Sequence, residues 1–117
     1  MNKDLEQAKA LLENNEEYTC AVCRAGESFA SEEHGVRPLM RWLNEGTDLS
    51  GASAADRIVG KAAAFLYVLL GVRTVYAPLM SVPARETLRA HSIEAIADTV
   101  VPAIRNLSLI HISEPTR

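Results

Sequence analysis

The sequence predicts an α/β fold in which a mixed β-sheet is flanked by helices, and three observations support this prediction. The chain has 117 residues, a length typical of one domain with a single core. Hydrophobic residues make up 48% of the chain and aromatic residues only 5%, which favours a core of small aliphatic side chains packed at close range. After residue 27, strand-like and helix-like segments alternate, as in parallel strands joined by crossover helices.

The N-terminal part of the chain predicts a helix followed by a β-hairpin. Apolar residues recur at helical spacing over 3–14, and Asn2 stands at the N-cap position. Residues 18–24 have the character of a strand, Ala25–Gly26 supplies a turn, and 27–30 form the returning strand. This hairpin makes the expected sheet mixed.

An acidic, solvated loop at 31–35 separates the hairpin from the next predicted helices. A short helix begins at Pro38 and ends at Gly46, where glycine can adopt the left-handed C-cap conformation. A central helix is expected over 53–70. Because most of this segment is apolar on nearly every side, we expect the helix to be buried against the sheet.

The C-terminal half of the predicted domain repeats the alternation of strand and helix. Residues 72–77 alternate as a strand does, and Pro78 is expected to end that strand. A helix over 82–90 and a further strand over 93–97 follow.

Charge and hydropathy exclude several classes of protein. The net charge of −3 and the mixture of both signs leave no basic stripe, so we expect no binding to nucleic acid. Three of the first six residues are charged, where a signal peptide would have a continuous apolar run. The longest uncharged stretch, 62–72, is about half of the ~20 residues that cross a bilayer. We therefore expect a cytoplasmic protein with no membrane segment.

The cysteines and histidines do not form a metal or redox site in this interpretation. Cys20 and Cys23 lie in a predicted strand, where side chains three positions apart point to opposite faces of the sheet. A redox pair would instead begin a helix. The histidines His34 and His91 are far from each other in the sequence, so we expect no zinc site and no cofactor.

The best candidate for a binding site is the start of the predicted central helix. The loop 46–53 has the glycine spacing of a phosphate-binding loop, but Ala52 replaces the lysine and the loop follows a helix. A helix N-terminus still holds anions well, although a plain capped loop is the alternative. Ser53 and Asp56 have the spacing of a capping box.

A polar stripe on the same predicted helix extends this candidate. Ser53, Arg57 and Lys61 follow one another at intervals of four residues. The stripe is either part of a ligand site or the only solvated edge of the helix. No catalytic residue is assigned, and the candidate ligand-binding residues are Ser50, Gly51, Ser53, Asp56, Arg57 and Lys61.

Two segments, SAADRIVGKAAA at 53–64 and VRTVYAPLM at 72–80, resemble the family named domain of unknown function 1893 (DUF1893). The likeness extends from residue 5 to about residue 106 and includes 18–20, 35–39 and 46–49. It implies a three-layer, cytidine-deaminase-like fold.

The same resemblance bears on zinc chemistry. In true deaminases a His-x-Glu motif begins one core helix and a Pro-Cys-x-x-Cys motif begins the next, and these motifs supply the zinc ligands and a general acid–base. Aligned with them, Ala54 stands at the histidine, Asp56 at the glutamate and Pro78 at the proline. Leu79 and Val82 then replace the two cysteines, so zinc-dependent deamination is not expected.

The last residues differ in character from the rest. Residues 107–117, LSLIHISEPTR, look like a translated sequencing-library adapter, with an ordinary amphipathic tail as the alternative. DUF1893 proteins usually continue into a segment containing Cys-Pro-Met-Glu, which this sequence lacks. We therefore expect one C-terminally truncated domain over 1–106 and a non-native tail.

Three functions remain open at this point. The first is a deaminase-like domain that binds a nucleotide or another phosphorylated small molecule without zinc catalysis. The second is a structural or interaction protein that forms a homo-oligomer through its alanine-rich helix and the lone Trp42. The third is a metal-independent enzyme that uses Asp56 and Lys61.

Overall fold

The computed structural model describes residues 2–104, which form four helices and six strands. Residues 105–117, including the suspected adapter segment, lie outside the described residues. No helix within 2–104 is long and apolar enough to span a membrane. In chain order the elements are α1 (Lys3–Asn14), β1 (Cys20–Arg24), β2 (Glu27–Ser31), α2 (Arg37–Glu45), β3 (Ser53–Asp56), β4 (Ile58–Val59), α3 (Lys61–Leu70), β5 (Thr74–Ser81), α4 (Val82–Ala90) and β6 (Glu94–Val101).

The strands form one mixed sheet, as the sequence predicts. β1 pairs antiparallel with β2 and β3, whereas β3, β4 and β6 all pair parallel with β5. Since β6 runs beside nearly all of β5, β3 and β4 must share the other edge of β5. They act as one strand that is interrupted at Arg57.

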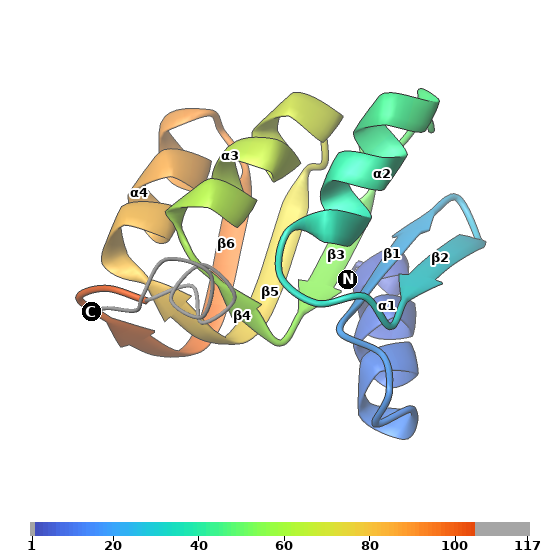
Figure 1. The fold of residues 1–117 in the computed structure, drawn as a ribbon, viewed down its shortest axis with the longest axis horizontal. Helices are drawn as coiled ribbons and strands as arrows, with labels where there is room; N and C mark the ends of the chain where they lie inside the picture. Colours follow the sequence, from blue (N-terminus) through green and yellow to red (C-terminus); the bar gives the residue numbers. More distant parts are fainter. Residues whose placement is uncertain (1, 105–117) are drawn as a thin grey trace, which may run out of the picture.

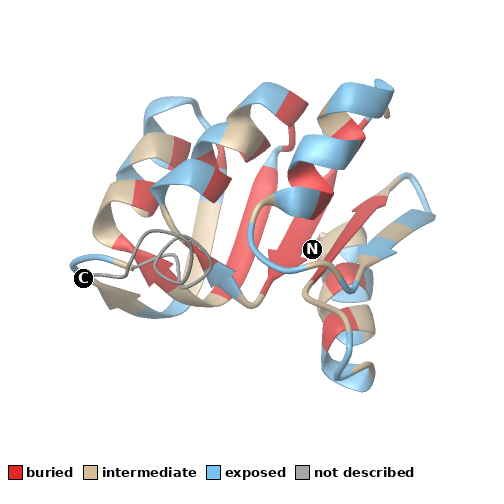
Figure 2. Ribbon diagram, viewed as in Figure 1, coloured by how far each residue is buried: buried red, intermediate tan, exposed pale blue. Residues whose placement is uncertain are grey.

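Helices cover both faces of the sheet, which gives the three-layer arrangement visible in Figure 1. α2, α3 and α4 lie on one face over a large apolar cluster that includes Tyr67, Met80 and Leu88. α1 lies on the other face over a smaller cluster. Cys20 belongs to the first cluster and Cys23 to the second, which confirms that the two cysteines point to opposite faces. Figure 2 shows the buried strands between the helical layers.

Local signals predicted the N-terminal elements correctly. The Asn2 side chain caps α1 by accepting a hydrogen bond from the Leu5 amide at 3.0 Å. Ala25 and Gly26 both have positive φ, at 52° and 87°, as a tight two-residue hairpin turn requires. Gly46 ends α2 in the left-handed conformation, and α4 spans the expected residues.

The predicted central helix over 53–70 is wrong in its first half. Ser53–Asp56 is strand β3, all four residues of which are buried between β1 and β5, and helix α3 begins only at Lys61. Ser53 therefore caps no helix; its hydroxyl accepts a hydrogen bond from the Asn2 side chain at 2.8 Å. A short apolar run suits a buried strand as well as a buried helix, so periodicity alone could not distinguish the two.

Pro78 does not end its strand, contrary to expectation. β5 continues through it to Ser81. The proline stands between the positions at which β5 pairs with Ala55 in β3 and with Ile58 in β4. Its missing N–H coincides with the interruption between those two strands, so it breaks no hydrogen bond of that ladder.

Candidate functional site

A pocket of about 680 Å³ opens at the N-terminal end of α3, and we call it the α3 pocket. Gly60 is the N-cap of α3 in an extended conformation, and no side chain caps the helix. The first backbone N–H groups of a helix have no partner within the helix. The α3 pocket is lined by Glu16, Glu17, Thr19, Glu32, His34, Gly35, Val36, Asp56, Arg57, Ile58, Gly60, Lys61, Ala62, Ala63 and Ile104.

Asp56 lies at the end of β3 and is the most buried ionisable group of the pocket, with only 9% of the residue exposed. The Tyr67 hydroxyl donates a hydrogen bond to its Oδ2 atom at 2.7 Å. The Ile58 amide makes a longer contact of 3.4 Å with Oδ1. Burial raises the pKa of Asp56 to about 7, because the ionised carboxylate loses its water, and these hydrogen bonds lower it only in part.

Behind Asp56 lie two further buried groups that can donate protons. Cys20 is the register partner of Asp56 on β1. Burial and the nearby Asp56 charge raise the pKa of Cys20, and they raise that of Tyr67 in the same way. Both groups therefore stay protonated at neutral pH, so Cys20 is a poor nucleophile.

Arg57 lines the pocket but uses its guanidinium group elsewhere. Its Nε atom donates to the Tyr18 carbonyl at 2.8 Å, and Nη2 donates to the carbonyls of Leu12 at 2.8 Å and Asn15 at 3.1 Å. These contacts satisfy carbonyl groups at the end of α1. The ion pairs within residues 2–104 do not include Asp56.

The rest of the lining carries both signs of charge. Lys61, the first residue of α3, is exposed in the pocket wall. Glu16 and Glu17 come from the segment between α1 and β1, and Glu32 from the segment between β2 and α2. The pocket thus combines a helix N-terminus and a lysine with several carboxylates.

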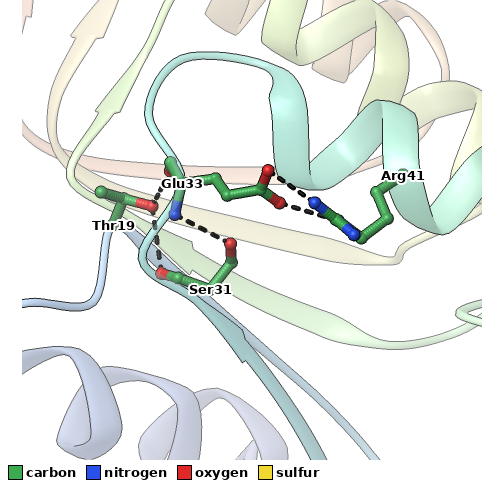
Figure 3. Close-up of polar contacts among 4 residues, drawn as sticks. All are labelled: Thr19, Ser31, Glu33 and Arg41. Carbon is green, nitrogen blue, oxygen red and sulfur yellow. Dashed lines mark hydrogen bonds and ion pairs between the residues drawn. The ribbon is translucent and has the colours of Figure 1, made fainter.

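Hydrogen bonds hold the wall formed by the segment 32–36, as Figure 3 shows. Arg41 of α2 donates hydrogen bonds to both carboxylate oxygens of Glu33, at 2.8 and 2.6 Å. These hydrogen bonds, and the Arg41 charge, lower the pKa of Glu33. The Glu33 amide donates to the Ser31 hydroxyl at 3.0 Å. The Thr19 hydroxyl contacts the Glu33 carbonyl and also the Ser31 carbonyl at 3.1 Å. The segment is the exposed loop that the sequence predicts, and these contacts anchor it to Thr19, just before β1, and to α2.

The structure divides the predicted binding residues between the two ends of β3. Asp56, Arg57 and Lys61 line the α3 pocket. Ser50, Gly51 and Ser53 lie at the other end, where the Gly51 amide donates to the Gly71 carbonyl at 2.8 Å. An extended strand separates residues 53 and 56 by about 10 Å, whereas a helix would have placed them on adjacent turns. The predicted stripe therefore does not exist as one surface.

The sequence does not indicate the two buried groups that neighbour Asp56 behind the pocket. Tyr67 lies in a segment whose pattern predicts only an apolar helix, and Cys20 lies in a predicted strand. Their contact with Asp56 joins α3, β1 and β3, and no local pattern reports it. The signal that existed was Gly60, a glycine before the apolar run, which marks the start of α3.

Comparison with known proteins supports the fold. A family model described as a domain of unknown function (DUF1893) matches residues 7–109. The crystal structure of a DUF1893 family protein from Thermotoga maritima has a TM-score of 0.77 at 21% identity, covering 92% of this chain and 74% of that one. The sequence matches no curated protein.

Two solved deaminases are also similar. A diaminohydroxyphosphoribosylaminopyrimidine deaminase/5-amino-6-(5-phosphoribosylamino)uracil reductase from Thermotoga maritima has a TM-score of 0.53 at 17% identity; the match covers 81% of this chain but only 35% of that protein. The dCMP deaminase of cyanophage S-TIM5 has a TM-score of 0.54 at 13% identity, covering 81% and 94%. The fold is therefore cytidine-deaminase-like.

The alignment put the zinc-ligand positions at Ala54, Leu79 and Val82. It is wrong for the first two, because Ala54 and Leu79 lie in strands, and only Val82 begins a helix. Motifs that begin helices belong at the starts of α3 and α4. Those starts carry Gly60-Lys61-Ala62 and Ser81-Val82-Pro83, without histidine or cysteine. Within residues 2–104, no group of three or more His, Cys, Asp or Glu side chains is placed to hold a metal ion. This donor set does not fit the zinc of a deaminase.

Proposed function

The chain belongs to the DUF1893 family, and from this premise we propose that it is a deaminase-like domain that binds a nucleotide or another phosphorylated small molecule in the α3 pocket without zinc. One observation carries the proposal. The uncapped N-terminus of α3 and the Lys61 side chain line the same pocket. Free backbone N–H groups, the helix dipole and a nearby ammonium group all favour a phosphate there.

The carboxylates of the pocket restrict this ligand further. Asp56, Glu16, Glu17 and Glu32 disfavour a bare anion, but their oxygens accept hydrogen bonds from N–H groups. A molecule with a phosphate at one end and N–H groups at the other satisfies both parts of the lining. The names of the two similar deaminases, which refer to dCMP and to phosphoribosyl compounds, support a ligand of this class.

The test measures the binding of nucleoside monophosphates to the full chain, by thermal shift and by calorimetry. We expect several of them to raise the melting temperature more than inorganic phosphate does. Lys61→Ala should weaken nucleotide binding about tenfold, since it removes one charge-assisted contact. Lys3→Ala, which removes an exposed lysine on α1, is the matched control and should leave the affinity unchanged. No stabilisation by any nucleotide at millimolar concentration would refute the proposal.

A second candidate function is general acid–base catalysis by Asp56, because a buried carboxyl group with a pKa of about 7 faces the pocket. The nucleotides that bind are incubated with the chain and analysed by chromatography. Conversion that Asp56→Asn abolishes without loss of binding would favour the enzyme. Recovery of unchanged nucleotide would favour the binding domain.

A further inference from the structure

The outer face of α3 exposes apolar side chains. Phe65 is 54% exposed and Leu69 is 60% exposed. Together with the exposed Ala62, they stand at positions i, i+3 and i+7 of the helix, on the side opposite the buried Ala63 and Tyr67. We call Ala62, Phe65 and Leu69 the α3 stripe. A helix that is apolar on all sides is normally covered on all sides.

The α3 stripe is also uncharged. After Lys61 the helix has no ionisable residue except the buried Tyr67. The helices on either side carry exposed charges of both signs, such as Arg41 and Glu45 on α2 and Glu86 and Arg89 on α4. An apolar centre within a charged surround is the usual composition of a protein–protein interface.

These residues differ from those expected to mediate self-association. Trp42 is only 7% exposed and packs edge-on against Phe29, with ring centroids 6.4 Å apart. Ala63 and Ala64 are also buried within the fold. Trp42, Ala63 and Ala64 therefore belong to the core, whereas Ala62 of the same alanine-rich run is exposed and belongs to the α3 stripe.

We propose that the α3 stripe pairs with the α3 stripe of a second copy in an antiparallel, two-fold symmetric dimer. In an antiparallel pair, residues at the start of one α3 face residues at the end of the other. The small Ala62 of each copy then lies opposite the large Leu69 of the second copy, and the two Phe65 side chains meet near the two-fold axis. The stripe is thus complementary to itself, and it offers no charge to attract an oppositely charged partner.

The exposed apolar area is sufficient for the centre of such an interface. Phe65, Leu69 and the 42% exposed Met40 of the adjacent α2 present on the order of 100 Å² each. A standard interface buries about 800 Å² per partner. The three side chains would supply roughly a third of that area, and the charged residues of α2 and α4 would supply the rim.

The experiment measures the mass of the full chain by light scattering and sedimentation over the micromolar range. We expect a dimer for the native chain. Leu69→Lys should give a monomer with an unchanged circular dichroism spectrum, because the position is exposed and the fold does not depend on it. Ala90→Lys, at an exposed position of α4, is the matched control and should remain dimeric.

Crosslinking gives a second readout, which detects the contact between two copies directly. Phe65 lies near the middle of α3 and hence near the proposed two-fold axis. In the Phe65→Cys variant, a short thiol crosslinker should therefore join two copies. Ala90→Cys should give no crosslinked dimer, and the native Cys20 and Cys23 are buried. A native chain that is monomeric at every concentration overturns the proposal, as does a dimer that survives Leu69→Lys.

Discussion

At the scale of single residues, Asp56 has the most unusual environment in the described part of the chain. Its carboxyl group is buried, and its closest side-chain partner is the neutral hydroxyl of Tyr67. The neighbouring guanidinium group of Arg57 is held by the carbonyls of Leu12, Asn15 and Tyr18. Arg57 therefore stabilises the end of α1, and Asp56 has no ion pair within the described residues. Its carboxyl group accordingly gains and loses its proton near neutral pH.

This environment predicts that the stability of the native chain decreases as pH rises from about 4 to about 7. The carboxyl pKa is near 3.8 in the unfolded chain and about 7 in the folded one. Between these values the folded chain keeps a proton that the unfolded chain has lost, so unfolding becomes easier as pH rises, with the full penalty above pH 7. Asp56→Asn keeps an acceptor for Tyr67 and removes the penalty. Relative to this variant, the native chain should lose up to about 4 kcal/mol of unfolding free energy between pH 4 and pH 8.

Urea unfolding at several pH values measures this difference. Asp98→Asn is the matched control, because the Asp98 carboxylate also accepts a tyrosine hydroxyl, from Tyr76, but lies at an exposed position. The Asp98→Asn chain retains Asp56, so it should show the same loss of stability with pH as the native chain. A pH-independent difference for Asp56→Asn would contradict the account of Asp56.

At the scale of secondary-structure elements, two glycines set the limits of α3. Gly60 precedes the helix with extended backbone angles. Gly71 ends it with φ at 79°, and its amide donates to the carbonyls of Tyr67 and Val68 at 3.1 Å each. The left-handed conformation at Gly71 strains any residue with a Cβ atom, whereas the conformation at Gly60 does not.

Replacing each of the two glycines by alanine should therefore lower the unfolding free energy by different amounts. Gly71→Ala should lower the unfolding free energy by about 1–2 kcal/mol, because alanine is strained at positive φ. Gly60→Ala should lower it by only about 0.5 kcal/mol, since its Cβ would meet Ile104 at an ordinary distance of 3.7 Å. Chemical denaturation of both variants checks the order. Equal losses would mean that backbone strain does not decide where α3 ends.

At the scale of the whole molecule, the sheet and its two helical layers bury most apolar side chains of residues 2–104, and nothing within that range covers the α3 stripe. The two buried apolar clusters form the core without Phe65 and Leu69. We therefore do not expect folding to require these two exposed side chains. A surface that is exposed in one copy and covered between two links stability to association.

If two copies associate through the α3 stripe, the melting temperature should rise with protein concentration. Folded dimers are favoured by mass action, whereas unfolded chains are not paired. We expect a rise of a few degrees over a hundredfold increase in native chain, measured by calorimetry. Leu69→Lys should remove this dependence, while Ala90→Lys should retain it. A melting temperature independent of concentration for the native chain would speak against the dimer.

The sequence by itself determined those elements whose signals are local. The Asn2 cap, the Ala25–Gly26 turn and the Gly46 C-cap each depend on a few neighbouring residues, so α1, the hairpin and α2 were predicted correctly. The DUF1893 resemblance was also visible in the sequence, and the fold it implies is confirmed. The expected cytoplasmic location, the absence of nucleic-acid binding and the non-native tail stay predictions.

Only the tertiary structure decided what 53–59 forms and where the site lies. Those residues become strands because β1 and β5, from distant parts of the chain, supply their hydrogen-bonding partners. Strand pairing is non-local, and an apolar segment carries no record of its neighbours. The same pairing separates Ser53 from Asp56 and brings Cys20 and Tyr67 next to Asp56. The sequence therefore pointed to Asp56, Arg57 and Lys61 of the α3 pocket but not to the neighbours of Asp56.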